Sequence, residues 1–141
     1  MTAKEYLQQY LDADREIQAK VDQIARLRDM ATRTTSAPAG DRVQSSAENK
    51  LERIISKIAD MEAEVDAEID RLADKRREVQ TAIERVPNAA QREVLIRRYM
   101  VGQKWEKIAV ELNFDYRWVL RLHGRALNEI QKETTKSHPN P

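Results

Sequence analysis

The chain contains 141 residues, of which 35% are charged and 5% aromatic, with three glycines, four prolines and no cysteine. This composition is typical of a mostly helical protein with extended coiled-coil elements rather than of one large globular core. The absence of cysteine excludes disulfides and thiolate metal sites. The polar N-terminal sequence and the lack of a long apolar run predict no signal peptide and no membrane partner, so a cytoplasmic location is expected.

Positive charge is concentrated in the C-terminal part of the chain. Residues 86–141 contain ten Lys and Arg against six Asp and Glu, whereas residues 1–85 contain fifteen against eighteen. The net charges are therefore +4 and −3. This asymmetry gives the C-terminal part a modest positive field, as affinity for nucleic acid requires.

Residues 2–31 are predicted to form a helix because their apolar side chains recur at helical spacing. The stripe consists of Tyr6, Tyr10, Ile17, Ile24 and Leu27, with Leu7 and Val21 beside it. Helical spacing is lost over residues 32–46, which are rich in Ser and Thr and contain Pro38 and Gly40. We therefore expect a long loop over this range.

The stretch 48–85 has the most regular apolar pattern in the chain. An apolar residue recurs every seven positions, at Leu51, Ile58, Val65, Leu72, Val79 and Val86. Most intermediate positions are apolar as well, at Ile55, Met61, Ile69 and Ile83, while Glu62 and Arg76 interrupt them. This pattern predicts a coiled-coil helix that folds back on the first helix as an antiparallel hairpin. Because its apolar seam is longer than the first helix, we also expect a homo-oligomer, with a dimer first.

Residues 86–133 are predicted to form three shorter helices. The first covers about 88–100 and ends before Gly102, and the second begins near Lys104 and stops at Asn113. Asp115 can cap the third helix through its carboxylate. The apolar stripe of the third helix consists of Val119, Leu122, Ala126, Leu127 and Ile130.

The spacing of three residues indicates a helix-turn-helix in this region. Ala109 is small where two helices must approach closely, Asn113 tolerates the left-handed conformation of a sharp turn, and Val119 can pack back on the preceding helix. The predicted fold is all-α. It consists of a long antiparallel helical hairpin (coiled coil) over 1–85, a C-terminal three-helix helix-turn-helix unit over 86–133 and a disordered tail over 134–141.

The face opposite the apolar stripe of the third helix carries a row of arginines. Arg117, Arg121 and Arg125 are four residues apart, so they lie along one side of a helix. Such a row suits a DNA major groove, where guanidinium groups bond guanine edges or phosphates. The alternative is an ordinary solvated basic face. The candidate DNA-binding set is Tyr116, Arg117, Trp118, Leu120, Arg121 and Arg125, with Arg121 as the base contact and Arg125 as a phosphate contact.

The run from Val86 to Glu133 resembles region 4 of bacterial sigma factors. The matching segments are Arg92-Glu93-Val94-Leu95 with Arg98-Tyr99, then Gly102, then Trp105-Glu106-Lys107-Ile108-Ala109, then Arg125-Ala126-Leu127. Lys104 departs from the Ser or Thr usual at the helix start, and Leu120 lies where sigma factors often carry a basic residue. The resemblance implies a fold that binds promoter DNA.

Taken whole, the chain resembles the ArpU-like family of small phage-encoded regulators. Further segments that carry this resemblance are Val43-Gln44-Ser45-Ser46, Ile69-Asp70-Arg71-Leu72 and Arg121-Leu122-His123-Gly124. The resemblance implies a sequence-specific transcriptional regulator of phage late genes that binds double-stranded DNA in the cytoplasm of the bacterial host cell. The hairpin would then serve oligomerisation or contact with RNA polymerase.

No catalytic constellation is visible, and neither an enzyme activity nor a cofactor is expected. The only histidines are His123, inside the predicted third helix, and His138, in the tail, and two histidines so placed do not predict a metal site. Two other functions compete with transcriptional regulation. A DNA-packaging protein of the small-terminase kind would assemble into rings, and a non-DNA helical adaptor would show no salt-dependent DNA binding.

Overall fold

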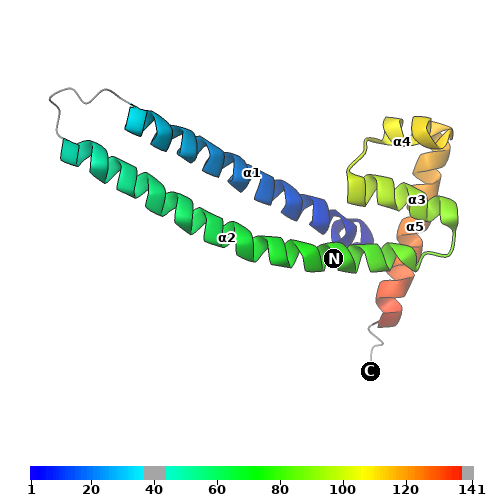
Figure 1. Ribbon diagram of the computed structural model, residues 1–141. Helices are drawn as coiled ribbons and strands as arrows, with labels where there is room; N and C mark the ends of the chain where they lie inside the picture. The colour runs from blue at the N-terminus through cyan, green and yellow to red at the C-terminus, as the bar shows by residue number, and fades with distance from the viewer. Residues whose placement is uncertain (37–43, 138–141) are drawn as a thin grey trace. The chain divides into compact units, whose positions relative to one another are not determined.

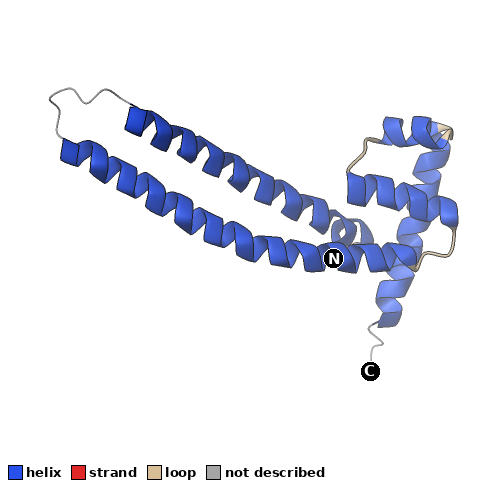
Figure 2. Cartoon of the chain, in the orientation of Figure 1, coloured by secondary structure: helices blue, strands red, loops and turns tan. Residues whose placement is uncertain are grey.

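The computed structural model describes residues 1–36 and 44–137. The helices in chain order are α1 (Ala3–Ser36), α2 (Gln44–Glu84), α3 (Ala89–Leu95), the π-helix η1 (Ile96–Val101), α4 (Trp105–Leu112) and α5 (Tyr116–Ser137) (Figure 1). Figure 2 shows short loops between the later helices and no strand among the described residues. The prediction of an all-α protein is thus confirmed. Over the same residues, no helix combines the length and apolarity needed to cross a bilayer.

Several predicted boundaries are wrong by a turn of helix. Helix α1 continues through residues 32–36 of the predicted loop, where the hydroxyls of Thr32 and Thr34 donate to backbone carbonyls four residues earlier at 3.0 and 2.8 Å. Helix α5 likewise extends to Ser137, into the predicted tail, with Thr134 bonded to the carbonyl of Ile130 at 2.8 Å. Threonine therefore stays helical here by satisfying its hydroxyl on the preceding turn. Residues 44–46 of the predicted loop belong to α2. The other loop and tail residues, 37–43 and 138–141, lie outside the described residues.

The chain divides into two compact units. The terminal unit comprises residues 1–13 and 72–141, and the middle unit comprises residues 14–71. The terminal unit is thus larger than the predicted domain 86–133, because it also contains the beginning of α1 and the end of α2.

In the middle unit, a segment of α1 packs on a segment of α2. The buried side chains are Ile17 and Ile24 from α1 with Ile54 and Val65 from α2. Ion pairs join Lys20 to Glu68 and Arg28 to Glu62, so the two segments run in opposite directions.

Part of the predicted seam is not buried. Ile55 and Ile69, predicted to lie on it, are 54% and 46% exposed. The seven-residue spacing is right for Val65 and Val79, which are buried. In the middle unit, however, the second line lies three residues after the first, through the buried Ile54 and the half-buried Met61, whereas Ile55 and Ile69 lie four residues after it. Because a side chain turns 100° per residue, this single step is enough to expose both isoleucines.

The terminal unit has two apolar clusters. The first joins residues from the two ends of the sequence, with Leu7 from α1, Val79 and Ile83 from α2, and Ala126 and Ile130 from α5. The other members of this first cluster are Ala3, Val86, Leu95 and Tyr99. The second cluster contains Val94, Ile108, Ala109, Val119 and Leu122. Helix α5 contributes to both clusters and therefore connects them.

Candidate nucleic-acid interface

The turn between α4 and α5 fixes where α5 begins. Asn113 adopts the left-handed conformation with φ of 56°, and the amide of Phe114 donates to the carbonyl of Ala109 at 2.9 Å. The carboxylate of Asp115 accepts a hydrogen bond from the amide of Arg117 at 2.8 Å. The predicted turn at Asn113 and the predicted cap at Asp115 are both confirmed.

The inner face of α5 anchors the helix in the terminal unit. Val119, Leu122, Ala126 and Ile130 are each at most 2% exposed, and Leu127 is half-buried against the first cluster. About three turns of helix are therefore held along one side. This packing holds α5 rigidly and so fixes the positions from which its outer side chains project.

The outer face of α5 carries the predicted arginine row. Arg117, Arg121 and Arg125 are all exposed. Within residues 1–36 and 44–137, none of the three forms an ion pair with a carboxylate. Three positive charges are thus presented along one helix face without an ion-pair partner among the described residues.

Three apolar side chains accompany the arginines at the start of α5. Tyr116, Trp118 and Leu120 are 43%, 36% and 39% exposed. The Arg125 guanidinium carbon lies 5.3 Å from the centre of the Trp118 ring, two helical turns away. This distance is within the range of a cation–π contact. The sequence suggested both residues but gave no reason to pair them.

An aromatic cluster behind α5 fixes the helix against η1. The Tyr99 hydroxyl lies 2.7 Å from Nε2 of His123, and the rings of Trp105 and His123 are 4.4 Å apart. Arg98 lies 4.5 Å from the centre of the Trp105 ring. Burial, with smaller contributions from Lys4 and Arg98, lowers the pKa of His123 to about 4. His123 is therefore a neutral support residue at pH 7.

A polar network that the sequence did not reveal links α3, η1 and α4. Arg97 forms ion pairs with Glu93 and Glu111, and Gln103 donates to Glu111 at 3.0 Å. The predicted helix over 88–100 changes at Ile96 into the π-helix η1, which ends at Val101 and is followed by Gly102 with φ of 84°. The wider turn of a π-helix is uncommon and shifts the following side chains. Apolar spacing alone could not predict it.

Gly124 lies on the outer face of α5 between the arginines. A Cβ atom added there would meet nothing within 4 Å, and the position is exposed. No packing within the described chain explains a glycine inside this helix, where it costs about 1 kcal/mol relative to alanine. A partner that approaches the helix backbone closely would explain it.

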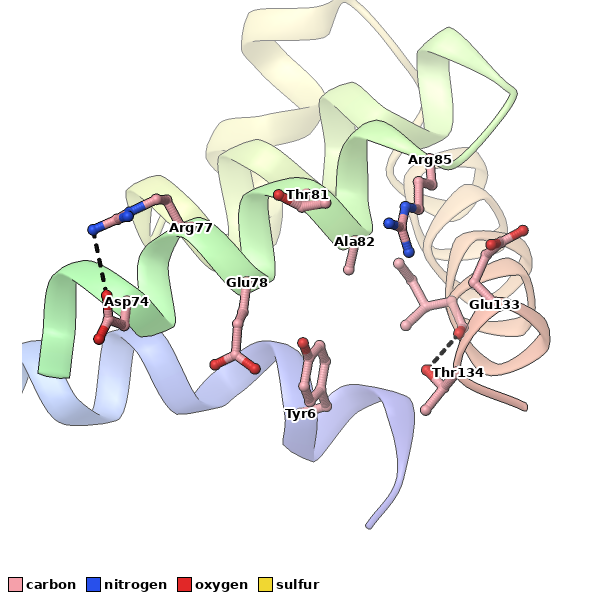
Figure 3. Close-up of a pocket in the computed structure, with 10 residues that line it drawn as sticks. Tyr6, Asp74, Arg77, Glu78, Thr81, Ala82, Arg85, Glu133 and Thr134 are labelled. Carbon is pink, nitrogen blue, oxygen red and sulfur yellow. Dashed lines mark hydrogen bonds and ion pairs between the residues drawn. The ribbon is translucent and has the colours of Figure 1, made fainter. Parts of the chain in front are cut away.

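The terminal unit also contains a groove on the side of α2 (Figure 3). Its apolar lining comes from Tyr6, Ala82 and Ile130, while Arg77, paired with Asp74 at 3.3 Å, is one of several charged side chains along it. Burial and the nearby Glu78 carboxylate raise the pKa of Tyr6. No cluster of metal-ligating side chains occurs anywhere in the part of the chain that the structure describes.

Comparisons with known proteins yield no relative. No family model, curated protein or solved structure matches the chain.

Proposed function

We propose that this protein is a sequence-specific DNA-binding transcriptional regulator of phage late genes, of the ArpU-like kind. In this proposal α4 and α5 act as a helix-turn-helix, and α5 enters the major groove of double-stranded DNA. The α1–α2 pair forms an antiparallel hairpin for oligomerisation or for contact with RNA polymerase.

One observation carries the proposal: the exposed arginine row of α5 on a helix whose opposite face is anchored in two apolar clusters. An α-helix fits the major groove, and arginine can bond guanine O6 and N7 with two hydrogen bonds. A rigidly held helix loses little conformational freedom on binding. The exposed Gly124 adds support, because it leaves room for a close approach of base edges.

The arginines have different roles in this proposal. Arg121 lies in the first half of α5 and is the contact to base edges, since the N-terminal part of a recognition helix reaches the bases. Arg125 lies a turn later beside Trp118 and contacts a phosphate. Tyr116, Arg117, Trp118 and Leu120 flank these contacts at the groove edge.

Selection of bound duplexes from a random pool tests the proposal. The full chain should enrich a defined sequence, whereas a variant with Arg117, Arg121 and Arg125 all changed to Ala should enrich none. Circular dichroism should show equal helix content in both proteins, since the three side chains are exposed. Absence of any enrichment by the parent protein would reject sequence-specific DNA binding and favour the adaptor function.

A further inference from the structure

The middle unit has an exposed apolar face that its own packing does not use. Val21 of α1 is 41% exposed, and Ile55 and Ile69 of α2 are 54% and 46% exposed. We call the side of the middle unit that carries these three residues, together with Arg28 and Glu62, the open face.

Helix geometry places these residues on one side of the middle unit. Val21 and Ile69 each follow one partner of the Lys20–Glu68 ion pair. Val21 also lies seven residues before Arg28, and Ile69 seven residues after Glu62, the partner of Arg28, so in these antiparallel helices the two apolar residues lie at the same level. In antiparallel neighbours a step of one residue turns both side chains toward the same side of the pair. Arg28 follows Val21 by seven residues, and Ile55, Glu62 and Ile69 are also seven apart, which keeps them on this side.

The two helix segments that carry the open face have opposite net charge. Residues 60–70 of α2 contain six carboxylates and no Lys or Arg, whereas residues 15–28 of α1 contain four Lys and Arg against two carboxylates. The paired side chains of Arg28 and Glu62 remain 64% and 42% exposed, so both can reach further partners. A second copy would therefore meet repulsion if it set α2 on α2, and attraction if it set α1 on α2.

We propose that the open face binds a second copy of this chain, with α1 of each copy beside α2 of the other. A two-fold axis parallel to the helices gives this arrangement and forms a four-helix bundle in which all neighbouring helices are antiparallel. Val21 of each copy then packs on Ile69 of the other, and Arg28 of each copy pairs with Glu62 of the other. This inference rests on the proposed function only in assigning the α1–α2 pair to oligomerisation, and it specifies which residues form the contact.

Sedimentation of the full chain over a concentration series tests the apolar part of the contact. Ile69→Asp and Val21→Asp should each weaken dimerisation by at least about tenfold, as expected for a charge in the centre of an interface. Met30→Asp is the matched control, because Met30 is equally exposed at 43% but lies outside the heptad lines of the open face. A parent protein that stays monomeric at roughly 100 µM would overturn the proposal, and so would unchanged dimerisation of Ile69→Asp.

Charge reversal tests the pairing between copies. Arg28→Glu and Glu62→Arg should each dimerise weakly alone, but an equal mixture should recover a heterodimer, because opposite charges then meet only between unlike copies. Both variants should keep the helix content of the parent. Failure of the folded variants to form a heterodimer would overturn the assigned contact. DNA binding is measured separately, so a DNA-binding monomer would overturn this inference alone, and a dimer that binds no DNA would overturn the regulator proposal alone.

Discussion

The hydroxyl of Tyr99 lies 2.7 Å from Nε2 of His123, which connects η1 directly to α5. Tyr99 is only 1% exposed, and its burial raises the pKa of its hydroxyl. The hydrogen bond thus joins two groups that are both neutral at pH 7. It ties the proposed recognition helix to the part of the terminal unit that contains the π-helix.

This contact predicts a loss of stability in mild acid. The pKa of His123 is lowered from 6.5 to about 4, so the unfolded chain binds more protons than the folded chain between these values. The contribution of neutral His123 to the free energy of unfolding is therefore fully present above about pH 6.5 and is lost as the pH falls towards 4. Urea unfolding of the parent and of His123→Gln across this range measures the effect. The variant should lose less stability than the parent, and parallel curves would contradict the prediction.

The second prediction concerns the N-terminal part of α1. Leu7 is fully buried beside Ala126 and Ile130, so Leu7→Ala should destabilise the terminal unit by roughly 2–5 kcal/mol. Unfolding followed by tryptophan fluorescence reports on this unit, since Trp105 and Trp118 both belong to it. Leu27→Ala in the middle unit is the control and should change this signal less. An unchanged transition in Leu7→Ala would contradict the shared core.

Gly124→Ala separates stability from binding. The change should stabilise the protein by about 1 kcal/mol, because alanine is the better helix former and nothing lies within 4 Å of the added methyl. DNA affinity should fall at the same time if the backbone of α5 lies close to the bases. Thermal unfolding and duplex titration measure the two effects. Stabilisation with unchanged affinity would place Gly124 away from the DNA.

The contact between Trp118 and Arg125 predicts a positioning role for the indole ring. Trp118→Leu should weaken binding to all duplexes by about 0.5–1 kcal/mol, the range of an exposed cation–π contact. In an Arg125→Ala background the same change should have little effect, because the guanidinium that the ring positions is gone. Equal losses in both backgrounds would show that Trp118 acts independently of Arg125.

The sequence predicted those elements whose signals are local. The turn at Asn113, the cap at Asp115 and the buried stripe from Val119 to Ile130 each follow from a residue type at a fixed spacing within one helix. The exposed positions of Arg117 and Arg121 followed from the same periodicity.

Features that depend on which other helix an apolar face packs against could not be predicted from the sequence. The spacing around Leu7 indicated an amphipathic helix, but not that this residue belongs to the same apolar cluster as Ile130, more than a hundred positions later. Likewise, the seven-residue spacing did not decide whether Ile54 or Ile55 would be buried. They follow Leu51 by three and four residues, and either spacing is compatible with a helix face. The π-helix at Ile96 has no signal in apolar spacing, since it depends on one extra residue per turn.

The most direct test of DNA recognition by α5 is a titration at several salt concentrations with a selected duplex and a scrambled one. Arg121→Ala should cost about 1–3 kcal/mol on the selected duplex and reduce discrimination, whereas Arg125→Ala should weaken both duplexes similarly and lower the salt slope by about one. Arg77→Ala removes the same charge from an exposed site on α2 and should bind like the parent. If Arg121→Ala and Arg125→Ala also bind like the parent, the arginine row of α5 does not contact DNA.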